Sequence, residues 1–321
     1  ITVEQVREAR DFADTALIII SRFSGEGWDR SSIEWDGEYN PWKTEPGTSM
    51  PAVSARIFPK GDFYLTAEEE EMIEKVKAEF DRIVVVLNIG GIMDTSWIKK
   101  DEKLNGALLA WQGGMEGGLA TAELLLGKAS PCGKLSDSFA AKVEDYLSTE
   151  NFHESFDYVN YTDDVYVGYR YFDSFHVAPR YPFGYGLSYT TFSIHTKEVD
   201  VDNDKVKLNI AVKNTGEYAG QEVVQVYVSC PQGRMTKEYQ RLAAFAKTKV
   251  LKSGEVQEVN ISFSLKDMAS YCEVDATYIL EEGNYIVRVG NSSRNTKIVM
   301  VAELDETVVI AQHENICKNE R

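Results

Sequence analysis

The sequence is short of positive charge, of cysteine and of histidine. Its 34 lysine and arginine residues face 51 aspartate and glutamate residues, which gives a formal net charge of −17. Such a chain repels phosphate backbones, so we expect no nucleic-acid partner. The cysteines at 132, 230, 272 and 317 form no C-x-x-C pair, and the four histidines do not cluster. The sequence therefore predicts no zinc site, no histidine-based triad and no disulfide scaffold, and we expect no metal and no cofactor.

Long apolar runs and targeting signals are also missing. No stretch of about 18 apolar residues is present, so we expect no membrane-spanning segment and no membrane partner. The first residues, Ile1 to Glu4, carry neither an initiator methionine nor a signal-peptide pattern, which indicates a piece of a longer polypeptide. The few cysteines indicate a reducing compartment, and we expect a cytoplasmic protein. A length of 321 residues suggests about two domains.

The first half of the chain alternates helical and strand patterns. Residues 3–13 predict an amphipathic helix, and Thr66 begins a second helix with Glu69 placed as in a capping box. Continuous apolar runs predict three strands of the kind buried on both faces of a parallel sheet, over 16–20, 83–87 and 106–111. This order is typical of an α/β domain, in which sites lie at the carboxyl ends of the strands.

The second half changes to short strands of alternating polarity near residue 192. Four such strands are predicted, over 206–212, 223–228, 256–263 and 285–289. Strands of this length with regular turn signals favour an all-β sandwich. We place the domain boundary near residue 190. The tyrosine- and phenylalanine-rich stretch from Tyr158 to Tyr189 is interpreted as packing between the two domains rather than as a sugar-binding platform.

A short loop directly after the first strand carries the best candidate for chemistry. Glu26 lies between Gly25 and Gly27, and glycines let a backbone turn sharply and approach a ligand closely. Trp28 could desolvate this carboxyl group, and desolvation raises a carboxyl pKa. A raised pKa suits a general acid that protonates a glycosidic oxygen and later acts as a base on water. The alternative is an ordinary exposed glutamate in a surface loop.

Several ordered stretches resemble glycoside hydrolase family 3. Residues 21–30 look like the acid/base loop of its β-glucosidases, and residues 127–135 match the family pattern G-K-x-x-P-x-G-K-L. The most specific matches are V-Y-V-G-Y-R-Y-F-D at 165–173 and Y-P-F-G-Y-G-L-S-Y at 181–189. The sandwich that follows resembles the family's fibronectin type III-like domain. The resemblance implies an α/β sandwich domain with a mostly parallel sheet over 1–190. It further implies the fibronectin type III-like domain over 191–301 and a tail or linker over 302–321.

The resemblance also implies a function in carbohydrate metabolism, as the acid/base part of a retaining exo-β-glycosidase. We expect a β-glucosidase that hydrolyses terminal non-reducing β-D-glucosyl residues, with Glu26 as the general acid/base. The aspartate nucleophile of the family lies on a (β/α)8 barrel, which needs about 200 or more further residues. The chain alone is therefore expected to be inactive. Its partners would be a β-linked glucoside or oligosaccharide and the missing barrel on the same polypeptide or another chain, with a homo-oligomer as a further option.

The chain departs from the family pattern in three places. Set against the family, the α/β domain is expected to lack its opening strand and helix, and the tail from about Ala302 resembles a linker into a barrel, as in members with reversed domain order. The loop 31–59 is long and contains Trp42, which we expect to wall the leaving-group subsite or else to pack against the barrel. With Trp42, the expected substrate contacts are Phe23, Ser24 and Trp28. The alternatives are a β-xylosidase, a β-N-acetylglucosaminidase or a non-catalytic carbohydrate-binding or assembly module.

Overall fold

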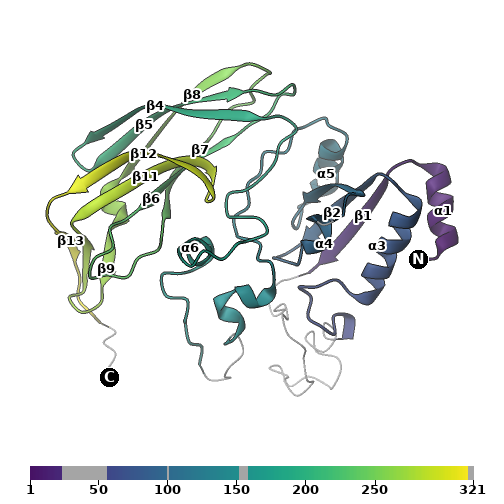
Figure 1. Ribbon diagram of the computed structural model, residues 1–321, viewed down its shortest axis with the longest axis horizontal. Helices are drawn as coiled ribbons and strands as arrows, with labels where there is room; N and C mark the ends of the chain where they lie inside the picture. The colour runs from purple at the N-terminus through teal and green to yellow at the C-terminus, as the bar shows by residue number, and fades with distance from the viewer. Residues whose placement is uncertain (24–55, 100, 152–157, 317–321) are drawn as a thin grey trace. The chain divides into compact units, whose positions relative to one another are not determined.

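A computed structural model describes residues 1–23, 56–99, 101–151 and 158–316 (Figure 1). The chain divides into two compact units, one formed by residues 1–125 with 139–159 and the other by 126–138 with 160–321. The first unit is α/β and the second is built on β-sheets, as predicted. Residues 126–138 and 160–189 pack with the sandwich, so they belong to its unit although they precede residue 190. The exact domain boundaries stay a prediction.

The first unit is built on a three-stranded parallel sheet. Its strands are β1 (Ala16–Arg22), β2 (Ile83–Ile89) and β3 (Leu104–Leu109), hydrogen-bonded in that order. Its helices are α1 (Val3–Phe12), α3 (Ala67–Glu79), α4 (Ser96–Lys99) and α5 (Gly117–Leu125), with 3-10 turns over Val143–Asp145 and Leu147–Thr149. Figure 1 shows α1 and α3 together on one side of the sheet. All three predicted strands are therefore present, as are the predicted helices over 3–13 and after Thr66 and a third that the sequence predicts over about 117–126.

Two helices of this unit begin as the sequence predicts. Thr66 caps α3, where its hydroxyl accepts the N–H of Glu69 at 3.2 Å while the Glu69 carboxylate accepts the N–H of Thr66 at 2.9 Å. Thr2 and Gln5 form the same reciprocal pair at the start of α1. Each pair satisfies two N–H groups that the first turn of a helix would otherwise leave without a partner.

The prediction that the strands are buried on both faces is correct for β2 and wrong for β1 and β3, since none of the residues 106–111 is buried. On β1, Ile18 and Ile20 are buried, but Leu17 and Ile19 on the opposite face are 53% and 60% exposed. The reason is position, because β2 lies in the centre of the sheet and β1 lies at its edge. The helices α1 and α3 cover one face of β1, and no described helix buries the other.

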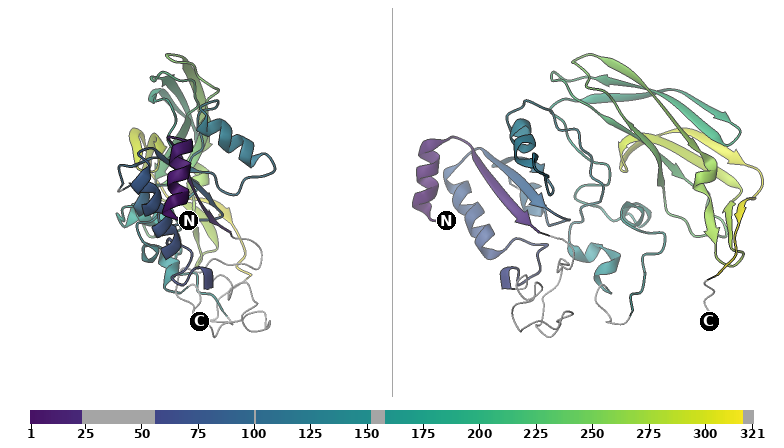
Figure 2. Two further views of the ribbon diagram at one scale, coloured as in Figure 1. Left: turned by 90° about the vertical axis from the view of Figure 1, so that its right-hand side faces the viewer. Right: turned by 180° about the vertical axis from the view of Figure 1, so that it is seen from behind.

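The second unit is a sandwich of antiparallel strands. One sheet has the order β12-β11-β6-β7 and a second has the order β4-β5-β8 (Figures 1 and 2). Their strands are β4 (Phe192–Asp202), β5 (Lys205–Asn214), β6 (Val223–Ser229), β7 (Arg241–Lys247), β8 (Val256–Ser264), β11 (Gly283–Ser292) and β12 (Asn295–Leu304). A third, smaller sheet contains β9 (Ser270–Cys272), β10 (Thr277–Leu280) and β13 (Val308–Gln312). A 3-10 turn, η3 (Leu265–Met268), precedes β9.

The core of the sandwich follows from residue alternation along its strands. On β5, Val206, Leu208, Ile210 and Val212 are all buried, while the residues between them face outward or are partly exposed. Side chains of a strand point alternately to its two faces, so this spacing directs one apolar row into the core. The stretch after Ala302, expected to be a tail or linker, contains the end of β12 and all of β13, which pairs with β10.

The most specific sequence motifs are packed onto this sandwich. The helix α6 (Tyr169–Ser174) lies within the first motif, and the Tyr169 ring stacks on Phe183 of the second motif with centroids 4.5 Å apart. The Tyr169 hydroxyl accepts the N–H of Leu242 at 2.7 Å. Lys134 forms a partly buried ion pair with Glu222 at 2.7 Å. These contacts hold Tyr169 and Phe183 within the second unit, while Val167 and Leu187 of the same motifs are exposed; the packing between domains that the sequence indicated stays a prediction.

Candidate active site

The candidate site lies at the carboxyl end of β1 in the first unit. The last residue of this strand, Arg22, is only 2% exposed, whereas the next residue, Phe23, is 61% exposed. Glu26, the expected acid/base residue, and Ser24, Trp28 and Trp42, the other expected contacts, lie outside the described residues. The structure therefore describes the base from which the candidate loop departs and the segment to which it returns.

Arg22 is the most highly connected side chain at this strand end. Its Nε donates to the carbonyl oxygen of Asp62 at 2.8 Å, and its Nη2 donates to that of Tyr64 at 2.9 Å. Two parallel bonds of 2.7 Å reach the carboxylate oxygens of Glu69, and Nη1 also donates to the Ser21 carbonyl at 2.9 Å. An arginine has five N–H donors in a fixed fork, and here each of the five has an acceptor.

An aromatic ring covers the guanidinium of Arg22. Its Cζ atom lies 4.5 Å from the centroid of the Phe58 ring, which is the geometry of a cation–π contact. The carboxylate of Glu69 is shared, because the same side chain also accepts the N–H of Thr66 at the start of α3. The charge of Arg22 is thus neutralised by a group that is itself held by a helix terminus.

Backbone hydrogen bonds connect the end of β1 to the end of β2. The N–H of Gly90 donates to the carbonyl of Arg22 at 3.1 Å, and the N–H of Asp94 donates to that of Phe63 at 2.8 Å. Phe63 is buried, and its ring meets Tyr64 edge to face at 4.9 Å. Burial raises the pKa of Tyr64, and the nearby carboxylates of the unit act in the same direction. These contacts make the strand ends and the segment around residue 63 one continuous structure.

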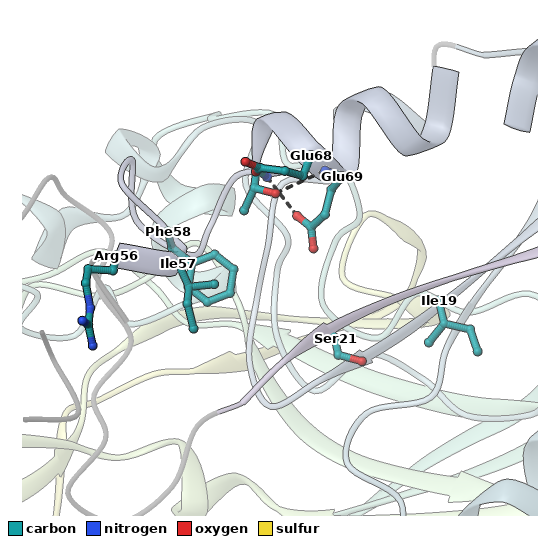
Figure 3. A pocket seen from close by; sticks show the side chains of 8 residues that line it. Ile19, Ser21, Arg56, Ile57, Phe58, Glu68 and Glu69 are labelled. Atoms are coloured by element: carbon teal, nitrogen blue, oxygen red, sulfur yellow. Dashed lines mark hydrogen bonds between the residues drawn. The ribbon is translucent and has the colours of Figure 1, made fainter. Parts of the chain in front are cut away.

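An open hollow of about 600 Å³ adjoins this structure. Its lining is Ile19 and Ser21 of β1, Arg56, Ile57 and Phe58, and Thr66, Glu68 and Glu69 at the start of α3. Figure 3 shows Ile19 and Ser21 projecting from β1 and Phe58 projecting from the segment that precedes α3. Residues 56–58 are the described end of the long loop that was expected to wall a leaving-group subsite. The lining mixes apolar side chains with hydroxyl groups, Arg56 and two carboxylates, of which that of Glu69 is already bound by Arg22.

Sequence reasoning missed Arg22. A signal for it was available, because alternation along β1 places residue 22 on the same face as Ile18 and Ile20, where an apolar side chain would be expected. Its partner Glu69 lies 47 residues further along the chain, and no local pattern joins the two. Among the described residues, no three histidine, cysteine, aspartate or glutamate side chains are grouped as metal ligands, and no helix is long and apolar enough to cross a membrane.

Comparisons with known proteins agree with this architecture. A model of the glycosyl hydrolase family 3 C-terminal domain matches residues 2–189, and a fibronectin type III-like domain model matches residues 222–293. A curated relative, β-glucosidase A of Butyrivibrio fibrisolvens, is 45% identical over 331 residues. That alignment covers 96% of this chain and 39% of the relative, so the chain spans well under half of the relative's length.

Solved structures give the same result. A β-glucosidase from Paenibacillus barengoltzii superposes with a TM-score of 0.86 at 36% identity, over 98% of this chain and 33% of that protein. β-Glucosidase 3B of Thermotoga neapolitana, solved in complex with α-D-glucose, superposes with a TM-score of 0.81 at 36% identity, over 96% of this chain and 40% of that protein. Neither unit that the structure describes is a (β/α)8 barrel. The chain therefore belongs to glycoside hydrolase family 3, with that family's C-terminal α/β domain followed by a fibronectin type III-like domain.

Proposed function

We propose that this chain is the acid/base-bearing part of a retaining β-glucosidase that removes terminal non-reducing β-D-glucosyl residues. The observation that carries the proposal is family membership together with the position of residues 23–30, which follow directly after β1. In an α/β sheet, loops at the carboxyl ends of strands are where ligands bind. The curated relative and the two solved structures named above are β-glucosidases, which supports glucose as the sugar.

In the proposed mechanism, Glu26 works in both steps. Its carboxyl group first gives a proton to the glycosidic oxygen while the aglycone leaves, and the nucleophile forms a covalent glycosyl-enzyme. The resulting Glu26 carboxylate then takes a proton from water, which attacks the anomeric carbon and releases the sugar. Phe23, Ser24, Trp28 and Trp42 are proposed to contact the substrate around this carboxyl group.

The nucleophile is proposed to come from outside this chain. In retaining glycosidases the two carboxyl groups lie about 5–5.5 Å apart, so Glu26 can act only when a second carboxylate is brought to it. We assign that carboxylate to an aspartate of a (β/α)8 barrel, either elsewhere on the same polypeptide or on another one. The chain by itself is therefore proposed to bind poorly and to hydrolyse nothing.

The test of Glu26 uses the complete enzyme, in which this chain is joined to its barrel. In Glu26→Ala, turnover of cellobiose should fall about 10²- to 10⁴-fold, the range supplied by general acid–base catalysis. The glycosylation step of 2,4-dinitrophenyl β-glucoside should change little, because its leaving group needs no proton. Azide should restore turnover and yield β-glucosyl azide.

A matched variant, Glu8→Ala, removes an exposed glutamate of α1 and should behave as the wild type. Equal losses on both substrates in Glu26→Ala, with no effect of azide, would show that Glu26 is not the acid/base residue.

A second candidate is a non-catalytic carbohydrate-binding or assembly module. One observation favours it, since the chain covers 39% of a curated relative and neither described unit is a barrel. The two candidates separate when the chain is assayed alone and together with its barrel polypeptide on aryl β-glucosides and β-xylosides. Hydrolysis of glucosides only by the combined protein supports the first proposal. A preference for β-xylosides would indicate a β-xylosidase in place of a β-glucosidase. Binding without hydrolysis by the combined protein would support the non-catalytic module.

A further inference from the structure

Arg22 joins the two ends of the segment that carries Glu26. The segment leaves β1 immediately after Arg22, and the described chain resumes at Arg56 and reaches Asp62 and Tyr64. The carbonyl oxygens of Asp62 and Tyr64 both accept hydrogen bonds from the Arg22 guanidinium, at 2.8 and 2.9 Å. The Arg22 side chain thus links the end of β1, where the segment begins, to residues 62–64, which follow the segment.

Glu26 is close to this clamp along the chain. It follows Arg22 by four positions, and a chain of four residues spans at most about 14 Å. A displacement of the Arg22 backbone is therefore passed to Glu26 through a very short connection. The same backbone is held from the β2 side, because the carbonyl of Arg22 accepts the N–H of Gly90 at 3.1 Å.

Stability alone does not explain an arginine at this position. The other residues on its face of β1, Ile18 and Ile20, are apolar and buried, and a long apolar side chain would continue that row. Replacing a buried ion pair by well-packed apolar residues is often neutral or stabilising. What an apolar side chain cannot supply is directed bonding to three separate segments, which here are the loop return, the helix α3 and the strand itself.

We propose that Arg22, held by Glu69 and Phe58, is the positioning residue of the acid/base loop. This inference rests on the proposed role of Glu26. Catalytic groups must be held within a fraction of an ångström, and a misplacement of about 1 Å can lower the rate about 10²-fold. Arg22 acts through Glu26, so its loss should reproduce the pattern of Glu26→Ala in a weaker form.

The test is a double-mutant cycle in the complete enzyme, with Arg22→Met, Glu26→Ala and the combined variant. Arg22→Met should lower kcat/KM for cellobiose up to about 10²-fold. It should leave the glycosylation of 2,4-dinitrophenyl β-glucoside within about threefold, and azide should partly restore turnover. In the Glu26→Ala background, Arg22→Met should have no further effect, because the group that it positions is already gone.

A matched control removes a different arginine of the same unit. Arg7 pairs with Glu79 at 2.9 Å between α1 and α3 and is 64% exposed in its side chain, so Arg7→Met should keep wild-type kinetics on both substrates. If Arg22→Met does not fold, Phe58→Leu replaces it. That change keeps all five hydrogen bonds of Arg22 and removes only the ring that covers it.

The outcomes separate the two hypotheses. If Glu26→Ala itself shows no dependence on the leaving group, the proposed function fails. If Glu26→Ala shows that dependence but Arg22→Met, or Phe58→Leu in its place, loses activity equally on both substrates or not at all, only the positioning role is overturned. The positioning role would also be overturned if Arg22→Met lowered kcat/KM for cellobiose by the same factor in the Glu26→Ala background as in the wild type.

Discussion

The buried ion pair between Lys237 and Glu281 allows a quantitative test of the second unit. The side chains of Lys237 and Glu281 are 1% and 7% exposed, and the Glu281 carboxylate also accepts the backbone N–H groups of Arg234 at 2.7 Å and Met235 at 3.3 Å. Removing one partner of such a pair leaves an uncompensated buried charge, which costs about 3–5 kcal/mol. Lys237→Met should therefore lower the free energy of unfolding of the sandwich by about that amount at pH 7.

The same pair predicts how this loss depends on pH. Burial opposes ionisation of Glu281, but the bonds from Lys237 and from the Arg234 N–H outweigh it, so the pKa of Glu281 is lowered in the fold from 4.5. A lowered pKa means that the stability gained from Glu281 is present above about pH 4.5 and is lost as the pH falls through the folded pKa. In Lys237→Met only burial and the N–H bonds remain, so a protonated Glu281 is tolerated. The difference between variant and wild type should thus shrink below pH 4.5.

The distribution of tryptophan provides the assay. All five tryptophans lie before residue 112, in the first unit, so their fluorescence reports the α/β unit alone. Urea unfolding of the sandwich is followed by near-ultraviolet circular dichroism at tyrosine wavelengths, because 13 of the 17 tyrosines lie in the second unit. Lys237→Met should move the tyrosine transition and leave the tryptophan transition in place. In Lys237→Met/Glu281→Gln most of the lost stability should return, because the uncompensated charge is removed and an acceptor remains for the Arg234 N–H.

Two results would refute this reasoning. A tyrosine transition within about 0.5 kcal/mol of the wild type at pH 7 would show that the pair lies in a well-solvated environment. A double variant as unstable as Lys237→Met would show that the loss comes from packing and not from charge.

Two further predictions concern the packing of the motif at 181–189 and the subsite loop. Gly184 has φ of +79°, and a Cβ built on it would lie 2.1 Å from Oε1 of the buried Gln225. Gly184→Ala should therefore lower the sandwich's free energy of unfolding by about 2–4 kcal/mol. Gly254→Ala, at φ of +76° with open space around it, should cost only about 1 kcal/mol, and equal losses would contradict the steric argument. In the complete enzyme, Trp42→Ala should raise KM for cellobiose more than for an aryl glucoside if Trp42 walls the leaving-group subsite; unchanged kinetics on both would remove it from that subsite.

The sequence predicts best the elements whose signals are local. The strands β1 and β2 are continuous apolar runs, and the capping box at Thr66 and Glu69 marks the start of α3 within one residue. Strand β7 has the sequence Arg-Leu-Ala-Ala-Phe-Ala-Lys, which is rich in alanine and lacks clear alternation, so we predicted no strand there. Its conformation comes from pairing with β6, a contact between residues about 20 positions apart.

The candidate site shows the same division. Glu26 is predicted from the glycines beside it and from family resemblance, and both signals lie in consecutive residues. Arg22 and Glu69 meet only when β1 and α3 pack, and no local pattern in the sequence connects the arginine on the apolar face of β1 with the glutamate of the capping box. The exposure of one face of β1 could not be predicted either. A continuous apolar run predicts that both faces of a strand are buried, but it does not identify the element that would cover each face.

The edge position of β1 has a consequence for handling the chain. Within the described residues β1 pairs with no strand other than β2, so its outer row of backbone donors and acceptors, apart from the Ser21 carbonyl that accepts from Arg22, can recruit another strand. Leu17 and Ile19 add an apolar strip beside that row, the combination by which edge strands add to one another. The chain produced on its own is therefore expected to associate through β1 as its concentration rises. Such aggregates would reflect an uncovered strand, so the native oligomeric state has to be measured on the complete enzyme.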